Sequence, residues 1–255
     1  MGQKLGQHFL IHSWAAKALA YAAEPREGET ILEIGPGKGV LTRELLALGP
    51  VVAVEKDEAL VEVIKHTFAD DIASGRLRIV SDDVRNVSPA SLGLSTFVLA
   101  ANIPYYITGE IIRQFLSGDT QPRAMALLIQ KEVAQRIVNK KESILSLSVK
   151  AYGTPRIVEK VPKKHFSPPP SVDSAILAVD NISKDFFDSV SEEKFFTVVR
   201  AGFASKRKMV ANNLSVTFDK EKVRAAMSAA RSDEKARAED IALEGWKQLT
   251  VALAK

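Results

Sequence analysis

The chain has 255 residues, a net charge of +4, a hydrophobic fraction of 46% and no cysteine. Its length indicates one large domain, or one domain with a small appendage. The lack of cysteine excludes disulfides, thiolate metal sites and thiol nucleophiles. No apolar run approaches the ~18 residues of a membrane helix, and the first residues lack the apolar core of a signal peptide. We therefore expect a cytoplasmic protein with no membrane contact, whose basic charge suits an anionic partner without requiring one.

The N-terminal region combines a polar, basic arm at residues 3–10 with the first predicted helix. His8 and His12 are four residues apart and could be two metal ligands on a helix. No third ligand lies nearby, so we expect no metal. A helix is predicted from about Ser13 and ends before Pro25. Its predicted apolar stripe consists of Trp14, Ala15, Ala18, Leu19 and Ala22.

A strand from Thr30 then leads into a glycine-rich turn with the spacing Gly35-x-Gly37-x-Gly39, followed by a helix. The dinucleotide fingerprint would place its third glycine at position 40, which is Val40. A nucleotide-triphosphate loop would have Ser or Thr after its lysine, where this chain has Gly39. The acidic Glu33 before the turn would repel a pyrophosphate. This pattern favours S-adenosylmethionine, whose amino and sulfonium groups are cationic.

Two later strands also end in carboxylates. The strand 51–55 ends in Glu55, twenty positions after Gly35, a spacing that suits a carboxylate binding two ribose hydroxyls. A solvated strand end is the alternative. The strand 77–81 leads to Asp82 and Asp83, and one of these could accept a hydrogen bond from the adenine amino group of a cofactor. Spacing alone leaves the choice between them open.

The apolar run 96–101 indicates a buried strand, which leads directly into Asn102, Ile103, Pro104 and Tyr105. Asn102 offers an amide oxygen as an acceptor, Pro104 fixes the backbone, and Tyr105 offers a flat ring on which a base could stack. Together these groups suit a planar amine at the end of a parallel strand. A simple Pro-Tyr turn would explain the stretch equally well if it stood alone.

The order of elements predicts a doubly wound α/β sheet of the Rossmann-like type. Beyond the elements above, it predicts a helix capped by Thr108 and a proline-rich loop that could hold Phe166 over the crevice. From about residue 183 only helices are predicted, which divides the chain into a domain at 1–182 and a helical domain at 183–255. Further predicted helices cover 58–68, 131–139, 142–152 and 241–253, and further strands cover 124–129, 155–161 and 172–179.

A basic run with one aromatic residue lies in the helical region. Four cations and Phe203 could grip a phosphate backbone. A solvated helix face would explain so short a run almost as well. The predicted RNA-binding residues are Arg200, Lys206, Arg207 and Lys208.

Several motifs in order resemble the ribosomal RNA adenine N6,N6-dimethyltransferase family, which includes KsgA and the Erm resistance methyltransferases. The resemblance covers essentially the whole chain, and the ending Val172-Asp173-Ser174 and the helical-tail motifs are closer to the KsgA branch. The matching stretches are Gly6-Gln7-His8-Phe9-Leu10, Glu33-Ile-Gly35-Pro-Gly37, Asn102-Ile-Pro104-Tyr105, residues 166–174, residues 203–214 and residues 237–246.

The resemblance implies an S-adenosylmethionine-dependent enzyme that dimethylates two adjacent adenines in a hairpin near the 3′ end of small-subunit (16S) ribosomal RNA. Its partner would be the small ribosomal subunit or its precursor. The enzyme would be a monomer and would act late in subunit assembly. The family often has Asn where this chain has His8, and its pattern selects Asp83 because Val84 follows. The implied cofactor positions are His8, Leu10, Gly35, Glu55, Asp83 and Asn102, and the implied catalytic positions are Asn102, Pro104, Tyr105 and Phe166.

The expected chemistry centres on the adenine amine. The Asn102 side chain and the main-chain carbonyl of Ile103 or Pro104 would accept hydrogen bonds from its N–H groups. Tyr105 and Phe166 would stack on the two faces of the base. One alternative is an Erm-like enzyme that acts on large-subunit RNA. Another is an assembly factor whose binding matters more than its methylation. DNA adenine methylation is disfavoured, because that motif usually begins Asp-Pro-Pro.

Overall fold

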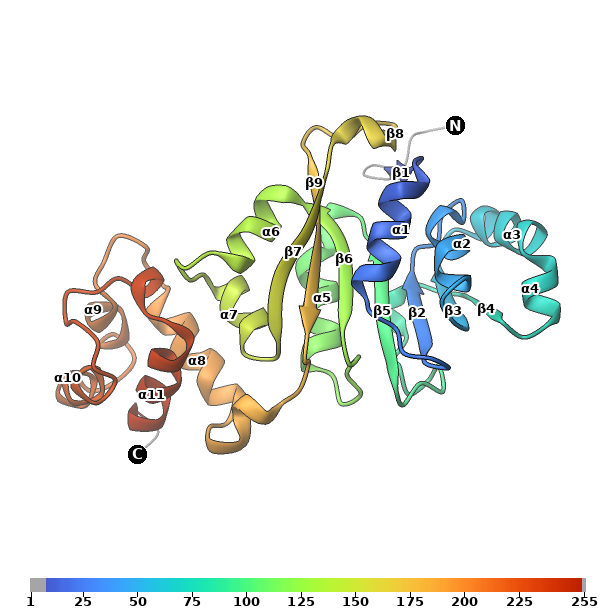
Figure 1. Cartoon of the computed structure of the whole chain (residues 1–255). Helices are drawn as coiled ribbons and strands as arrows, with labels where there is room; N and C mark the ends of the chain where they lie inside the picture. The colour runs from blue at the N-terminus through green and yellow to red at the C-terminus, as the bar shows by residue number, and fades with distance from the viewer. Residues whose placement is uncertain (1–7, 254–255) are drawn as a thin grey trace. The chain divides into compact units, whose positions relative to one another are not determined.

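The computed structural model describes residues 8–253, which form two compact units (Figure 1). The sheet unit contains the chain up to residue 134 and residues 154–182, and the helical unit contains residues 135–153 and the chain from 183 onward. Gly6, Gln7 and the rest of the predicted arm before His8 lie outside the described residues. Within the described part, no helix is long and apolar enough to cross a membrane.

Seven strands form the sheet in the order β4-β3-β2-β5-β6-β9-β7. The first five run parallel, and the last two are antiparallel to their neighbours. The order reverses between β2 and β5, and the predicted doubly wound α/β fold is thereby confirmed. The strands are β2 (Thr30–Ile34), β3 (Val51–Glu55), β4 (Leu77–Ser81), β5 (Phe97–Asn102), β6 (Met125–Gln130), β7 (Thr154–Val161) and β9 (Ser174–Asp180).

Helices cover both faces of this sheet, which is why the central strands are continuous apolar runs. One buried cluster joins alternate strand residues, including Ile31, Val98 and Leu128, to the helices of one face. Figure 1 shows α5 behind the sheet, on the opposite face from α1. The helices of the sheet unit are α1 (Ser13–Ala22), α2 (Val40–Leu46), α3 (Glu58–Thr67), α4 (Ala69–Ala73) and α5 (Thr108–Ser117). Thr108 is the first residue of α5, and its N-cap makes no side-chain hydrogen bond, so the predicted cap is wrong.

The position of Trp14 in α1 differs from the predicted apolar stripe. The buried side of the helix consists of Ala15, Ala16, Leu19, Ala20 and Ala22. The small alanine side chains let the helix lie close to the sheet and α2, and the larger indole is turned outward. Trp14 is 41% exposed.

A second, two-stranded sheet ties the N-terminal segment to the proline-rich loop. β1 (Phe9–Leu10) pairs antiparallel with β8 (Phe166–Ser167). The backbone N–H of Ile11 also donates to the carbonyl of His165 at 3.0 Å. Strands of two residues carry no readable sequence periodicity, so the sequence does not predict this pairing.

In the helical unit, residues 135–153 pack with the C-terminal helices. Glu142 N–H donates to the Glu239 carbonyl at 2.8 Å, and Ser183 N–H donates to the Tyr152 carbonyl at 2.9 Å. The compact units therefore do not follow a single cut after residue 182. α6 (Lys131–Val138) leads into this unit, whose helices are α7 (Ile144–Lys150), α8 (Glu192–Gly202), α9 (Val210–Leu214), α10 (Lys220–Ala229) and α11 (Leu243–Leu253).

Candidate active site

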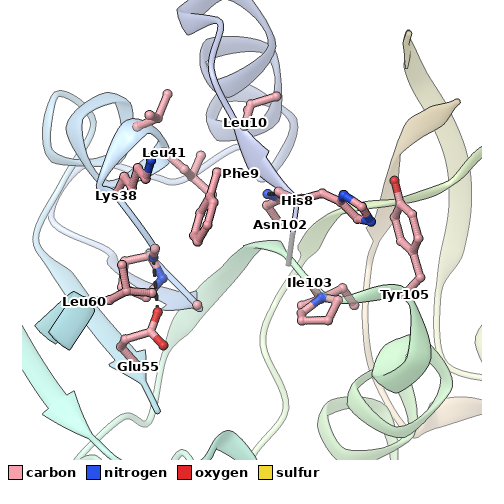
Figure 2. A pocket seen from close by; sticks show the side chains of 15 residues that line it. His8, Phe9, Leu10, Lys38, Leu41, Glu55, Leu60, Asn102, Ile103 and Tyr105 are labelled. Carbon is pink, nitrogen blue, oxygen red and sulfur yellow. Dashed lines mark hydrogen bonds between the residues drawn. The ribbon is translucent and has the colours of Figure 1, made fainter. Parts of the chain in front are cut away.

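A pocket opens at the carboxyl ends of β2, β3 and β5, where the strand order reverses (Figure 2). Open α/β sheets bind ligands at this point. Residues from β1 and from the starts of α2 and α3 complete its wall. The lining residues are His8, Phe9, Leu10, Gly35, Pro36, Gly37, Lys38, Val40, Leu41, Glu55, Leu60, Asn102, Ile103, Pro104 and Tyr105.

The glycine-rich turn brings backbone rather than side chains to this pocket. Gly35 and Gly37 have φ values of +67° and +59°, a region that other residues rarely adopt. A Cβ atom on Gly35 would meet nothing within 4 Å, so the space above this residue is open. A Cβ atom on Gly37 would lie 3.0 Å from the Phe9 ring. The turn can therefore let a ligand approach its main chain closely.

Glu55 presents the carboxylate of this pocket. Its Oε2 accepts from the Gly37 N–H at 3.2 Å, and its Oε1 accepts from the Asp57 N–H at 2.9 Å. The residue is buried, and these two bonds fix the orientation of its side chain. A carboxylate has about four acceptor positions, so each oxygen can accept one more hydrogen bond. This arrangement suits a pair of hydroxyl groups.

Asn102 is oriented by a hydrogen bond to His8. Its Nδ2 donates to the main-chain carbonyl of His8 at 3.2 Å. A carbonyl can only accept, so this contact identifies the NH₂ end of the amide. The Oδ1 atom makes no hydrogen bond with another described residue, and it is the acceptor that Asn102 offers to a ligand.

Two contacts hold the Tyr105 side chain at the pocket, one through its hydroxyl and one through its ring. Its hydroxyl lies 2.7 Å from Oγ of Ser174, and its ring centroid lies 5.8 Å from that of His8. Burial, followed by the charge of Asp173, raises the pKa of Tyr105, while the bond to Ser174 acts in the opposite direction. The phenol therefore stays neutral. His8 is held in turn by its Nδ1, which donates to the Pro168 carbonyl at 2.8 Å.

Glu33 differs from the sequence-based interpretation. It is fully buried in β2, does not line the pocket, and neither of its oxygens has a hydrogen-bond partner among the described residues. Burial raises its pKa to about 8, and the nearby Glu55 carboxylate adds to this rise. The Thr42 side chain lowers the pKa and offsets part of the effect. Glu33 is therefore mostly protonated at neutral pH. Among the residues that line the pocket, Glu55 supplies the carboxylate.

Two of the predicted cofactor-binding and catalytic residues lie outside the pocket lining. Asp83 follows β4, and its Oδ2 atom accepts from Arg85 Nη2 at 2.6 Å and from Lys56 Nζ at 2.8 Å. The hydrogen bonds from Arg85 hold the pKa of Asp83 well below its usual range. Phe166 is 3% exposed and belongs to the buried core beside its strand partner Leu10. Its ring is buried in this core, so the expectation that it covers the crevice does not describe this structure.

The structure exposes all four predicted RNA-binding cations in the helical unit. Arg200 is in the last turn of α8, and the other three form the turn before α9. Asn213 holds this turn by donating to the carbonyls of Gly202 and Ser205, at 2.7 and 2.9 Å. Phe203 stacks on Trp246 with a centroid distance of 5.4 Å, so it supports the unit from within and is not interleaved with the cations.

Comparison with known proteins identifies the chain's relatives. The family model described as ribosomal RNA adenine dimethylase matches residues 2–255. The chain belongs to this family. Two related proteins are the ribosomal RNA small subunit methyltransferases A of Dehalococcoides mccartyi and Clostridioides difficile. The first is 40% identical over 96% of this chain and 86% of its own length, and the second is 34% identical over 97% and 89%.

Solved structures share the fold of this dimethylase-family chain along almost its whole length. The 23S rRNA methyltransferase ErmE has a TM-score of 0.80 and 25% identity, covering 97% of this chain and 100% of its own. A dimethyladenosine transferase from Plasmodium falciparum has a TM-score of 0.77 and 22% identity, covering 95% and 96%. The Rossmann-like methyltransferase fold is thus confirmed.

Sequence reasoning missed several lining residues of the pocket. Phe9 lies against Gly37, and the Nζ atom of Lys38 is 5.2 Å from the centroid of its ring. Leu60 lines the pocket from α3. Phe9 stands inside one of the family motifs, so the motif could have suggested it. Leu60 belongs to an ordinary amphipathic helix and gives no such signal. Ser174, the partner of Tyr105, is also part of a family motif.

Proposed function

We propose that this dimethylase-family enzyme transfers methyl groups from S-adenosylmethionine to N6 of two adjacent adenines in the 3′-terminal hairpin of small-subunit (16S) ribosomal RNA. It acts as a cytoplasmic monomer on the small subunit or its precursor and contributes to subunit biogenesis. The observation that carries this proposal is the orientation of Asn102. Its donor end is bound to His8, and its free oxygen lies in the same pocket as Glu55 and the glycine turn.

The residues of the pocket fit S-adenosylmethionine, which supplies an electrophilic methyl group when bound. Glu55 would accept from the two ribose hydroxyls, and the open backbone at Gly35 would allow close approach of the ligand. His8 and Leu10 complete the wall on the β1 side. Asp83 would receive the adenine amino group of the cofactor, which requires it to share its acceptor positions with Arg85 and Lys56.

The target amine is a poor nucleophile because its lone pair is delocalised into the adenine ring. Asn102 Oδ1 and the main-chain carbonyl of Ile103 or Pro104 would accept hydrogen bonds from the two N–H groups of this amine. Pro104 fixes the backbone that presents these acceptors. The hydrogen bonds would move N6 toward tetrahedral geometry and localise the lone pair. Preorganised acceptors of this kind need no reorganisation during the reaction, and a strong general base is not required because proton loss can follow methyl transfer.

Tyr105 would stack on the extruded base, a contact worth ~1–3 kcal/mol. Its bond to Ser174 holds the ring in place before the base arrives. A base that lies in a loop or at an end leaves its stack at lower cost than one inside a duplex. In the helical unit, Arg200, Lys206, Arg207 and Lys208 would contact the RNA backbone through their charges.

The names of the relatives favour small-subunit RNA over large-subunit RNA. The two small-subunit methyltransferases named above are 40% and 34% identical to this chain, whereas ErmE is 25% identical. The test is methyl transfer by the purified protein to unmethylated small and large ribosomal subunits, each with labelled S-adenosylmethionine. We expect label in the small-subunit RNA. Label confined to large-subunit RNA would replace this proposal with the Erm-like one.

A further inference from the structure

A basic and aromatic surface lies beside the pocket mouth in the sheet unit. Its residues come from the start of α1 and from the short turn before β8, which the β1–β8 pairing and the Ile11–His165 hydrogen bond hold together. We call this surface the Trp14 patch. Its residues are Ile11, His12, Trp14, Lys163, Lys164 and His165.

In the Trp14 patch, the ring of His165 contacts the rings of both His12 and Trp14. The His165 ring lies edge-on to His12 with centroids 4.6 Å apart, and edge-on to Trp14 with centroids 5.1 Å apart. Trp14 is nevertheless 41% exposed, and the adjacent Ile11 is 50% exposed. The contacts with His165 fix the indole, while much of its surface remains open to solvent. A fixed aromatic ring of this kind is a suitable platform for a base.

The charges around this platform are positive. Lys163 and Lys164 are exposed, and neither side chain forms an ion pair with another described residue. Partial burial, followed by the electrostatic effects of His12 and Lys164, lowers the pKa of His165 and favours its neutral form, so the two lysines carry the positive charge. The nearby Asp173 carboxylate accepts from the backbone N–H of Lys163 at 3.0 Å and sets one negative charge against the two lysines. The charge of the Trp14 patch complements a phosphate backbone.

The Trp14 patch is also close to the pocket in which the target adenine would react. Leu10 lines that pocket, and four residues of chain lead from it to Trp14, a span of at most ~14 Å. A short single strand next to an extruded base could cover this distance. The excess of cations beside an open aromatic ring favours RNA over a protein partner, whose surface would offer both charge signs.

We propose that the Trp14 patch binds an unpaired nucleotide next to the target adenine, with its base stacked on Trp14 and its phosphates near Lys163 and Lys164. This rests on the proposed function, because it takes RNA as the substrate. It adds a binding surface of the sheet unit to the cations of the helical unit, and it assigns a role to the exposed indole.

Tryptophan fluorescence tests this directly, since the chain has two tryptophans and Trp246 is fully buried. Quenching by acrylamide, a neutral molecule, therefore reports on Trp14, and the difference from Trp14→Phe isolates its signal. The probe is an unmethylated RNA with the 3′-terminal small-subunit hairpin and its single-stranded flank. We expect this RNA to reduce the quenching constant of Trp14 at least about twofold. Unchanged quenching with bound RNA would overturn the proposal, as would protection by the intact subunit alone, which would indicate a protein contact.

Binding of the same RNA by variants completes the test. Trp14→Ala should raise the Kd for RNA at least about fivefold, which corresponds to ~1 kcal/mol of stacking, and Trp14→Phe should retain most of the affinity. Tyr21→Ala is the matched control, because Tyr21 is exposed on the same helix ~10 Å away. All variants should keep the affinity for S-adenosylmethionine. Equal RNA affinity of Trp14→Ala and the wild type would overturn the proposal. These experiments measure RNA binding and not methylation. A failure of the proposed function would instead appear in the methyl-transfer comparison of small and large subunits described above.

Discussion

At the scale of single residues, the pocket is organised by hydrogen bonds that leave specific acceptors free. The bond from Asn102 to the His8 carbonyl and the bonds from backbone N–H groups to Glu55 each fix one side chain. The Asn102–His8 contact could not be derived from sequence, because the two residues are 94 positions apart in the chain. The sequence predicts the residue types at the site, and the structure adds their orientation.

Asn102→Ala removes the side-chain acceptor and leaves the main-chain acceptors at Ile103 and Pro104 in place. We expect turnover to fall by at least ~10²-fold, since a preorganised hydrogen bond at the reacting atom is removed. The Kd for S-adenosylmethionine should change by only a few-fold, because Glu55 and the glycine turn remain. Single-turnover methyl transfer and calorimetric titration of the cofactor measure the two effects. Turnover close to that of the wild type would remove Asn102 from the mechanism.

Tyr105 contributes a ring and a hydroxyl, and two substitutions separate them. Tyr105→Phe loses only the bond to Ser174, so kcat/KM should fall by less than about tenfold, the value of a neutral hydrogen bond. Tyr105→Ala also loses the stacking surface and should fall further, by up to ~10²-fold. Ser174→Ala removes the same hydrogen bond from the other side and should match Tyr105→Phe. Equal losses for Phe and Ala at position 105 would assign the role to the hydroxyl.

At the scale of helices and strands, the sequence predicts the parallel strands almost to the residue, because burial on both faces makes them continuous apolar runs. It misses the two-residue strands β1 and β8, since they are too short for any periodicity. The spacing of Trp14 fits an apolar stripe, but the alanines of α1 occupy the buried side. Phe166 is expected over the crevice, whereas its β8 pairing buries it. Tertiary pairing decides both cases.

Glu33 in β2 links this strand to pH. Its pKa rises from the ordinary 4.5 to about 8 in the folded chain. The folded state therefore binds this proton more tightly, and stability should decrease as pH rises from 4.5 to about 8, by up to roughly 5 kcal/mol. Glu33→Gln keeps the shape of the side chain and cannot ionise, so this part of the pH dependence should disappear.

Urea unfolding of both proteins at pH 5 and pH 9 measures this effect. The wild type should lose more stability than Glu33→Gln between the two conditions. If the two proteins lost the same amount, Glu33 would not carry a raised pKa.

At the scale of the whole molecule, a sheet unit with the pocket is combined with a helical unit that exposes the predicted RNA-binding cations. The change in composition after residue 182 is readable in the sequence. The membership of residues 135–153 in the helical unit is not, because it depends on contacts such as Glu142–Glu239. A helix predicted correctly from its periodicity can still belong to either of two units.

The cations of the helical unit make a prediction about salt. Replacing Lys206, Arg207 and Lys208 with Gln should weaken RNA binding and reduce the slope of log K against log salt by about three, one for each phosphate that is no longer neutralised. Neutralising Lys220, Lys222 and Arg224 on α10 removes the same charge elsewhere in this unit and should change the slope less. Titrations between 50 and 200 mM salt, roughly the range over which such slopes are read, decide this. An unchanged slope in the first variant would make its residues an ordinary solvated surface.

The central claim is that this pocket methylates adjacent adenines of small-subunit RNA. The most direct measurement maps N6,N6-dimethyladenine in ribosomal RNA from cells that contain the wild-type protein, no protein, or the Asn102→Ala variant. We predict two adjacent dimethyladenines near the 3′ end of the small-subunit RNA with the wild type, and their loss in the other two cases. Persistence of both modifications without the protein, or their appearance only in large-subunit RNA, would contradict this account.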